Sequence, residues 1–479
     1  MILRVINHPY EFDMKNLCIT FFPHEKIRLE GEEDPVVVTT RRETDGSFFV
    51  SAKVYDVYRE TTAKPKPADE EHLVLSVTLY RLLSGILGFA PPWGVLYGVR
   101  PAKLMHRLCA QMGDDAAVAH FQTAFLTQKS KAELAHEVML HENRSIARSG
   151  PKSFSLYVSI PFCPTRCAYC SFVSHSIEKT HKLMTPYVDL LLRELEETSK
   201  YAKELGLELA TVYFGGGTPT TLSAQDLGRI FSTIEQNFDL SHLMEYTVEA
   251  GRPDTVTRER LEVIQAAGVQ RISINPQSFN DKVLEAIGRR HTAQQTLDAF
   301  ALARDCGFDH INMDFIAGLP EDDLPSFQRS IQTALDLQAE SITVHTLALK
   351  TSAYMVTREQ TFDLKDRLTV SNMVDYAGQT LHGAGYYPYY MYRQSKSLGN
   401  LENVGWCKPG YDCLYNVYMM DETHTVLAVG AGAVTKLRGQ NSGMIERIYN
   451  YKYPYEYIRD FDTLLERKKR IPGFYAEYD

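Results

Sequence analysis

Segments typical of buried strands alternate with segments typical of helices from residue 153 onward. Each strand-like segment is short and apolar, and the next segment spaces its apolar residues three or four positions apart, as one face of a helix does. Six such units in succession predict a parallel sheet with helices outside, since parallel neighbours need a crossover connection. A closed barrel of this type needs eight units, so we expect a partial (β/α)6 barrel in an α/β fold. The strand candidates are residues 155–162, 210–216, 245–250, 271–277, 310–318 and 341–349.

The length of 479 residues predicts two or three domains. Residues 1 to about 65 are rich in β-branched and aromatic residues separated by turn signals, and amphipathic helical segments follow. We therefore expect an N-terminal α+β accessory domain over residues 1–150, the partial barrel over residues 151–350 and a C-terminal mixed extension over residues 351–479. Further strands are expected in the extension at residues 385–394, 414–420 and 425–437.

The charge balance argues against a general polyanion-binding surface. The chain has 51 Lys and Arg residues against 60 Asp and Glu residues, a formal net charge of -9, so we expect no nucleic-acid partner. The first residues lack the apolar core of a signal peptide, and Gly and Pro interrupt the most apolar window, residues 82–98. We therefore expect a cytoplasmic protein with no membrane span, whose cysteines are reduced thiols or metal ligands.

Three of the eight cysteines, Cys163, Cys167 and Cys170, lie close together in the sequence. They form a Cys-x3-Cys-x2-Cys loop directly after the first predicted barrel strand, at the edge where such folds carry their active sites. Thiolates this close in sequence can hold one soft metal centre. Iron–sulfur clusters usually take four cysteine ligands, so three would leave one iron open to a substrate or cofactor.

Two other interpretations of this loop stay open at this point. A structural zinc ion could take the three thiolates with His175 as its fourth ligand, because cysteine spacings overlap between metals. Alternatively, the three thiols could be unrelated to one another. The other cysteines are Cys18, Cys109 and Cys306 in apolar or helical contexts typical of core residues, and Cys407 and Cys413 in a loop.

Polar or small residues stand at the ends of the other predicted barrel strands. A Gly-rich run follows the second strand, where backbone N–H groups would be exposed without side chains in the way. Burying polar side chains unpaired is costly, so their shared position predicts a polar pocket around the metal and argues against a purely structural zinc site. These residues are Gly215, Gly216, Gly217, Thr218, Glu249, Asn275, Gln277 and Asp314, with Arg289 and Arg290 just beyond the fourth strand.

In combination, these segments resemble the radical S-adenosylmethionine (SAM) enzymes, and more narrowly the oxygen-independent coproporphyrinogen III dehydrogenase family. The resemblance covers roughly residues 150–460, with the motifs in the family's order. The segments PWGVLYGVRPAKL and ENVGWCKPG are similar to the HemZ-type branch of this family. The other motifs are YVSIPFCPTRCAYC, VYFGGGTPT, TVEAGRPD, RISINPQSFN, IGRRHT, NMDFIAGLP and VGAGAVTK.

The resemblance implies a radical SAM partial barrel with a [4Fe–4S] cluster. Cys163, Cys167 and Cys170 would hold three irons, SAM would bind the fourth, and the C-terminal extension would complete the substrate pocket. The glycine run would hydrogen-bond the methionine amino group of SAM, Arg289 would pair with its carboxylate, and Asp314 would meet its ribose hydroxyls. The other implied site residues are Thr218, Glu249 and Gln277, with Tyr157 as an aromatic side chain near the cluster that could equally be barrel packing.

The reaction that the resemblance implies is an oxidative decarboxylation. An electron cleaves SAM to methionine and a 5′-deoxyadenosyl radical, which takes a hydrogen atom from the β-carbon of a substrate propionate. Loss of CO2 and one electron then leaves a vinyl group, and two such events convert coproporphyrinogen III to protoporphyrinogen IX in haem biosynthesis. An electron donor such as flavodoxin or ferredoxin is implied. The alternatives are a haem-binding chaperone and a radical SAM enzyme that acts on haem itself.

Two positions depart from the family's pattern. Ser159 stands where a histidine is common, and Phe172 stands where a further cysteine is common. The second of these positions is not a cluster ligand in the family. Both departures therefore concern the substrate and a second bound SAM, and they leave SAM cleavage itself intact.

A substrate with four propionates needs cations in an otherwise acidic chain. Arg252, Arg393 and Lys396 are the candidates, because they stand on predicted loops that could face the pocket. Each could equally be a solvated surface charge. The Tyr-rich segment GYYPYYMYRQSK could stack on a macrocycle, although a sheet edge or the core suits its composition as well.

Overall fold

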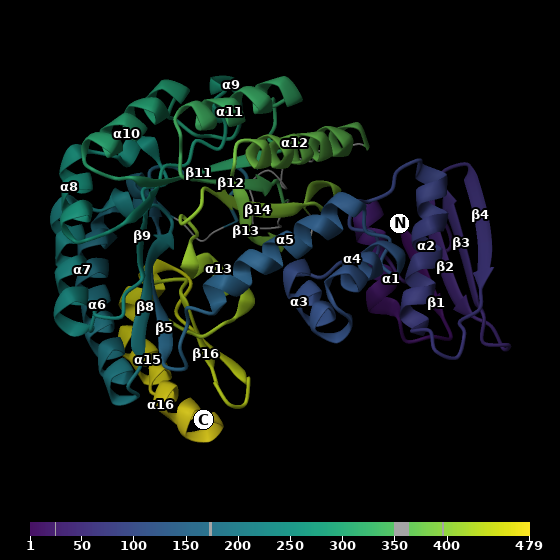
Figure 1. The fold of residues 1–479 in the computed structure, drawn as a ribbon, viewed down its shortest axis with the longest axis horizontal. Coiled ribbons are helices and arrows are strands. Elements are labelled where there is room, and N and C mark those ends of the chain that lie inside the picture. Colours follow the sequence, from purple (N-terminus) through teal and green to yellow (C-terminus); the bar gives the residue numbers. More distant parts are fainter. Residues whose placement is uncertain (24, 172–174, 349–363, 395–396) are drawn as a thin grey trace.

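The computed structural model describes residues 1–479 except 24, 172–174, 349–363 and 395–396. An eleven-stranded sheet forms the body of the molecule, and a four-stranded sheet forms a lobe beside it (Figure 1). Parallel strands in chain order make up the middle of the large sheet, with helices on the outer side, so the partial (β/α)6 barrel is confirmed. The strands are β5 (Ser153–Ile160), β8 (Glu208–Gly216), β9 (Glu245–Glu249), β10 (Arg271–Ser273), β11 (His310–Ala317) and β12 (Ser341–Thr346). The helices are α6 (Ile177–Glu204), α7 (Ala224–Asn237), α8 (Arg258–Ala266), α9 (Asp281–Ala286), α10 (Ala293–Asp305) and α11 (Leu324–Asp336).

The barrel strands present different residues to their two faces, because successive side chains of a strand point to opposite sides. Val212 and Phe214 of β8 are fully buried, and the ring of Phe214 lies 5.2 Å from the ring of Phe231 on α7. Tyr213 between them belongs to a separate buried cluster on the other side of the sheet. This alternation directs apolar residues to the helices and leaves the inner face for polar and aromatic side chains.

The C-terminal extension adds strands to both edges of the barrel, so the large sheet stays open. One pair, β14 (Glu402–Cys407) and β13 (Tyr387–Arg393), continues antiparallel from β12. On the other edge, β15 (Thr425–Val429) pairs in parallel with β5, and β16 (Val434–Arg438) and β17 (Ile445–Tyr449) follow antiparallel. The carboxyl end of β15 therefore meets the carboxyl end of β5.

The strand expected at residues 414–420 is wrong, since Leu414–Asp421 form the helix α13. The buried carboxylate of Glu245 accepts hydrogen bonds from the backbone N–H groups of Leu414 (2.6 Å) and Tyr415 (3.2 Å). A carboxylate that satisfies the first amides of a helix stabilises its N-terminus. This tertiary contact overrides the preference of the Tyr- and Val-rich segment for a strand.

The four-stranded sheet has a hydrophobic core of its own with two helices packed on it. The next three helices differ, because their buried residues, such as Met105 and Phe121, belong to the core of the barrel. The division into three domains stays a prediction, and its expected boundary near residue 350 lies outside the described residues. The elements are β1 (Ile2–Ile6), β2 (Val36–Arg42), β3 (Phe48–Val54) and β4 (Val57–Ala63) with α1 (Glu11–Phe21) and α2 (Glu71–Leu87), then α3 (Pro101–Met112), α4 (Asp114–Thr123) and α5 (Lys129–Ile146).

A buried ion pair fixes the end of β15. Glu194 of α6 and Lys468 of α15 (Phe461–Lys468) are both fully buried, with 2.7 Å between Oε1 and Nζ. The same carboxylate accepts the backbone N–H of Gly430 at 2.7 Å. The next residue along, Ala431, accepts a hydrogen bond at its carbonyl from the hydroxyl of Ser159 at 2.7 Å. Ser159, which stands where a histidine is common in the family, thus joins the end of β5 to the loop after β15.

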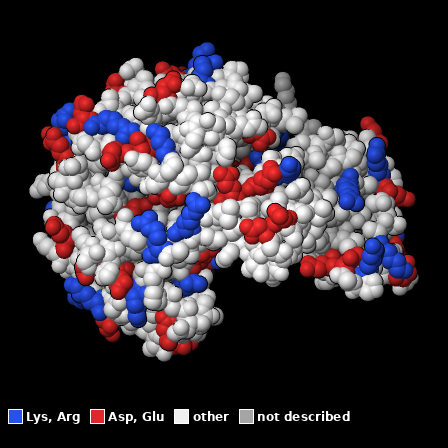
Figure 2. Space-filling view, viewed as in Figure 1, with Lys and Arg blue, Asp and Glu red and all other residues white. Residues whose placement is uncertain are grey.

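The surface mixes both signs of charge. On the face drawn in Figure 2, Lys and Arg side chains are interspersed with Asp and Glu side chains. Within the part of the chain that the structure describes, no helix combines the length and the apolar character needed to cross a membrane.

Candidate functional site

The carboxyl ends of the parallel strands meet at one edge of the barrel, as the register shows. Ser159 pairs with Gly215, and Ser273 pairs with both Glu249 and Asn312. Strand ends at the same level place their following residues side by side. The polar residues at the ends of the predicted strands are therefore brought together.

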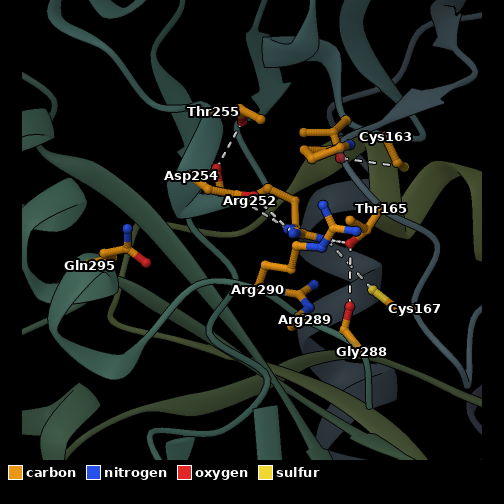
Figure 3. A network of polar contacts seen from close by, with 12 residues as sticks. Cys163, Thr165, Cys167, Arg252, Asp254, Thr255, Gly288, Arg289, Arg290 and Gln295 are labelled. Atoms are coloured by element: carbon orange, nitrogen blue, oxygen red, sulfur yellow. Dashed lines mark hydrogen bonds and ion pairs between the residues drawn. The ribbon is translucent and has the colours of Figure 1, made fainter. Parts of the chain in front are cut away.

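The cysteine loop leaves this edge and is fastened to the segment after α9. The N–H of Ala168 donates to the carbonyl of Ile287 at 2.9 Å, and the hydroxyl of Thr165 donates to the carbonyl of Gly288 at 3.3 Å (Figure 3). Among the loop thiols, Cys167 is buried, while Cys163 and Cys170 are half-buried. The hydroxyl of Thr218 donates to the sulfur of Cys163 at 3.5 Å, so the glycine run and the loop are in contact.

The loop thiols and His175 do not form a preformed zinc site among the described residues. One zinc ion with Zn–S bonds of about 2.3 Å would draw its sulfur ligands to within roughly 4 Å of one another. The ring of His175 instead lies edge-on to those of Tyr453 and Tyr455. Among the described residues, one group of three metal-capable side chains has ligand atoms within 4.8 Å of one another, and it lies elsewhere, at Cys109, Asp114 and His136.

The glycine run packs directly against the chain between β5 and the cysteine loop. The N–H groups of Gly217 and Thr218 donate to the carbonyls of Ile160 and Phe162, both at 2.7 Å. A Cβ atom on Gly217 would lie 2.6 Å from the carbonyl oxygen of Phe162, so only glycine fits. The expectation that these N–H groups are exposed is therefore wrong for Gly217 and Thr218. The carbonyl groups of the run suit an ammonium group such as that of SAM, because an ammonium group only donates.

Glu249 stands beside the glycine run. Its Oε1 accepts a hydrogen bond from the hydroxyl of Tyr213 at 2.6 Å and lies 3.2 Å from where a Cβ on Gly215 would be. Burial raises the pKa of Glu249 to about 7, Asp314 acts in the same direction, and the hydrogen bond from Tyr213 opposes both. A carboxyl with this pKa is poised between its two protonation states near neutral pH.

We expect Glu249→Gln to remove a pH-dependent loss of stability. Because the pKa of Glu249 rises on folding from 4.5 to about 7, its contribution to stability is present below 4.5 and is lost as the pH rises through about 7. Between acidic and neutral pH, the free energy of unfolding of the apoprotein should therefore fall less in the variant, by on the order of 2 kcal/mol. Denaturant unfolding at a series of pH values measures this difference, and parallel pH profiles for both proteins would contradict it.

Asp314 lies in a chain of polar contacts across β11, β12 and β13. Its Oδ1 accepts from the amide of Asn312 at 2.8 Å, and its Oδ2 lies 3.8 Å from Nε2 of His345. The hydroxyl of Tyr392 lies 3.4 Å from the other ring nitrogen of His345. Burial works to raise the pKa of Asp314, but His345 and Asn312 outweigh it, and the pKa is lowered. The carboxylate is thus ionised and able to accept hydrogen bonds from a ligand.

The segment after β10 presents buried polar atoms without partners. Gln277 has a φ of 67°, in the left-handed region that non-glycine residues rarely adopt, and it is held there by backbone hydrogen bonds with Asp314 and Ile316. Its Oε1, Oδ1 of Asn275 and the hydroxyl of Ser273 are buried and make no hydrogen bond among the described residues. Such atoms are costly unless a ligand satisfies them, so this segment fits SAM, which carries several hydrogen-bond donors.

The neighbouring arginines of the IGRRHT motif point in different directions. Arg289 is buried and donates to the carbonyl of Asn275 at 2.5 Å and to the hydroxyl of Tyr169 at 3.4 Å. Its Nε has no partner among the described residues. Arg290 is exposed and pairs with Glu178 at 2.6 Å. The structure thus brings Arg289 to the site and leaves Arg290 at the surface.

Of the three candidate substrate anchors, the structure describes Arg252 and Arg393, and both are buried. Arg393 is buried, stacks 5.1 Å from the ring of Trp93 and donates to backbone carbonyls. Burial lowers its pKa to about 9. It is neither a solvated charge nor available to a propionate, so this expectation is wrong. Arg252 is also buried and faces the cysteine loop, and Lys396 and Phe172 lie outside the described residues.

Most of the Tyr-rich segment belongs to the core, as its composition also allowed. Tyr386, Tyr389 and Tyr390 are buried, whereas Tyr392 lies beside His345 at the site. Tyr157 lies in a stack of rings, and its expected place near the cluster stays a prediction. The rings next to it are those of Tyr213 at 6.3 Å and Tyr415 at 6.0 Å.

Sequence reasoning missed three polar residues at this edge, namely Asn312, Tyr213 and His345, and it expected Arg252 to face a substrate. Two of them, Asn312 and His345, could have been found from the period of two in a strand. Asn312 precedes Asp314 by two positions, and His345 follows Thr343 by two, so each shares the inner face with a polar neighbour. The contact of Arg252 with the cysteine loop had no such signal in the sequence, because it joins two loops.

The fold and the cysteine loop define a radical SAM protein. Residues 157–334 match the profile of the radical SAM superfamily. Proteins of this superfamily use a [4Fe–4S] cluster and SAM, and the orphaned polar atoms, the glycine run and the three thiols fit both groups.

The chain belongs to the family of the oxygen-independent coproporphyrinogen-III oxidase-like protein HemZ. It is 34% identical over 470 residues to HemZ of Bacillus subtilis (strain 168), a match that covers 95% of this chain and 94% of HemZ. It is also 30% identical over 320 residues to the heme chaperone HemW of Haemophilus influenzae, covering 66% of this chain and 78% of HemW. Coproporphyrinogen III oxidase (HemN) from Escherichia coli shares the fold, with a TM-score of 0.51 at 21% identity over 68% of this chain and 72% of HemN.

Proposed function

We propose that this chain is a radical SAM oxidoreductase that converts propionate groups of coproporphyrinogen III to vinyl groups without oxygen, giving protoporphyrinogen IX. The observation that carries the proposal is the match to HemZ along nearly the whole chain, including the N-terminal lobe and the C-terminal extension. The polar edge around the cysteine loop supplies the site. The reaction belongs to a reducing compartment, in keeping with a cytoplasmic protein.

In this proposal each residue of the site has a separate binding role. Cys163, Cys167 and Cys170 would hold the cluster, which when bound supplies the electron that cleaves SAM to the radical that takes the substrate hydrogen. Carbonyls of the glycine run would accept from the SAM ammonium, with the carboxylate of Glu249 beside them. The guanidinium of Arg289 would pair with the SAM carboxylate and Asp314 with the ribose hydroxyls. The packed barrel would exclude water from the radical.

We expect Asp314→Ala to weaken SAM binding about tenfold or more while the cluster is retained. A charge-assisted hydrogen bond typically contributes on the order of 1.5–3 kcal/mol, which corresponds to this change in affinity. Equilibrium dialysis of SAM measures the affinity, and iron and sulfide analysis measures the cluster. Asp309→Ala is the matched control, since Asp309 is exposed just before the opposite end of the same strand and should leave SAM binding unchanged. Equal affinities in the two variants would refute the assignment of Asp314.

An electron donor must reach the cluster from outside the barrel. A surface cavity of about 730 Å³ opens beside the cysteine loop, lined by Thr165 and Arg166 from the loop and by Glu178, Glu285 and Arg290 around it. The loop reaches the surface here. This cavity supports an approach by a small protein donor such as flavodoxin or ferredoxin.

The HemW relatives favour a second candidate, a haem-binding chaperone. The two functions separate in one experiment without oxygen, in which the reconstituted protein is given SAM, a reductant and either coproporphyrinogen III or haem. The proposal expects vinyl products together with 5′-deoxyadenosine. Tight haem binding with no vinyl product would favour the chaperone, and SAM cleavage that depends on haem would favour an enzyme that acts on haem itself.

A further inference from the structure

Arg252 occupies an unusual place for a charged residue. It follows β9 in the loop before α8, and 3% of its surface is exposed. Two of its nitrogens, Nε and one terminal nitrogen, each donate to one carboxylate oxygen of Asp254 at 2.9 Å (Figure 3). Such a two-pronged pair fixes the plane and direction of the guanidinium group.

The remaining terminal nitrogen of Arg252 faces the cysteine loop. It lies 3.1 Å from the hydroxyl of Thr165 and 3.8 Å from the sulfur of Cys167, to which it donates (Figure 3). The hydroxyl of Thr165 in turn donates a hydrogen bond to the carbonyl of Gly288. One buried side chain thus reaches both the backbone anchor of the loop and one of its three thiols.

The chemistry of this contact acts on the cluster in a defined direction. Hydrogen bonds to ligating sulfurs and nearby positive charge make the reduced cluster more stable, because reduction adds a negative charge. The effect is strong where water is excluded, since a buried charge is poorly screened. The carboxylate of Asp254 lies on the far side of the guanidinium and acts in the opposite direction.

We propose that Arg252, held by Asp254, is a positioning residue that fixes the cysteine loop at Cys167 and raises the reduction potential of the cluster. Asp254 sets the size of this rise by partly neutralising the guanidinium. The inference rests on Cys167 being a cluster ligand, as proposed above, and not on the identity of the substrate. It replaces the earlier expectation that Arg252 anchors a propionate.

The test is the midpoint potential of the reconstituted cluster, measured by a spectroscopic redox titration without SAM. Arg252→Gln should shift the potential to a more negative value, because it removes the positive charge beside the sulfur. Asp254→Asn should shift it to a more positive value, because it leaves the guanidinium without its counter-charge. The matched control is Arg258→Gln, which removes an exposed guanidinium that donates to Cys306 at 3.7 Å, away from the cysteine loop, and should leave the potential unchanged.

Opposite shifts from Arg252→Gln and Asp254→Asn would establish the electrostatic role. A purely structural role would loosen the loop in both variants, so shifts of the same sign, or no shift in either, would overturn the proposal. If Arg252→Gln holds no cluster, Arg252→Lys carries the test. Arg252→Lys keeps the positive charge, so its midpoint potential should stay close to that of the unmodified protein. A large shift in this variant would instead indicate a loosened loop. Loss of the ligand assignment itself would show separately, as an intact cluster in Cys167→Ala.

Discussion

Cys167→Ala protein is expected to contain no [4Fe–4S] cluster after anaerobic reconstitution. Cys167 is the buried member of the three loop thiols, and the contacts of Thr165 and Ala168 hold it in place on both sides. A cluster held by three cysteines has no spare ligand, so the loss of one thiolate removes an entire iron site. Iron and sulfide content and the absorbance of thiolate-ligated iron measure the result.

Cys413→Ser is the matched control for this prediction. Cys413 is also buried, but its sulfur lies 3.4 Å from the carboxylate of Glu245, inside the barrel and away from the loop. Its replacement should leave the cluster content unchanged. A Cys167→Ala protein with the iron and sulfide content of the unmodified protein would show that the cluster is held elsewhere.

The second large effect concerns stability, and we expect it from Lys468→Met. The substitution leaves the carboxylate of Glu194 buried without its cation, although Gly430, Asn450 and Tyr457 still donate hydrogen bonds to it. An uncompensated buried charge typically costs about 3–5 kcal/mol. The free energy of unfolding, measured by denaturant titration of the apoprotein, should fall by this amount.

Two further variants separate the buried pair from a general effect of removing a lysine. Lys469→Met removes the next lysine, which is exposed and pairs with Glu466, and should leave the free energy of unfolding nearly unchanged. The double variant Glu194→Leu/Lys468→Met should recover part of the loss, because neither charge is then left alone. A Lys468→Met protein as stable as Lys469→Met would contradict this account of how the end of β15 is fixed.

The barrel could be predicted from the sequence because its strands and helices are each marked by local patterns. Each of the six strand candidates of the barrel overlaps an observed strand, since buried parallel strands are continuous apolar runs. The segment at Leu414 was different, because its local preference for a strand is overridden by the buried carboxylate of Glu245. A contact between residues so far apart in the sequence leaves no local signal.

The site was partly predictable for a similar reason. The ends of successive parallel strands must meet, so Glu249, Gln277 and Asp314 could be grouped before their contacts were known. The contacts of individual side chains could not be predicted in this way. Arg252 was expected to face a substrate, but Asp254 turns it toward Cys167.

The polar edge around the cysteine loop should bind a cluster and SAM and cleave SAM reductively. The most direct measurement is the formation of 5′-deoxyadenosine from SAM by the anaerobically reconstituted protein with dithionite. We expect 5′-deoxyadenosine to form with the unmodified protein, to require both SAM and reductant, and to be absent with Cys167→Ala. A protein that contains one zinc ion and no sulfide, and that forms no 5′-deoxyadenosine, would contradict it.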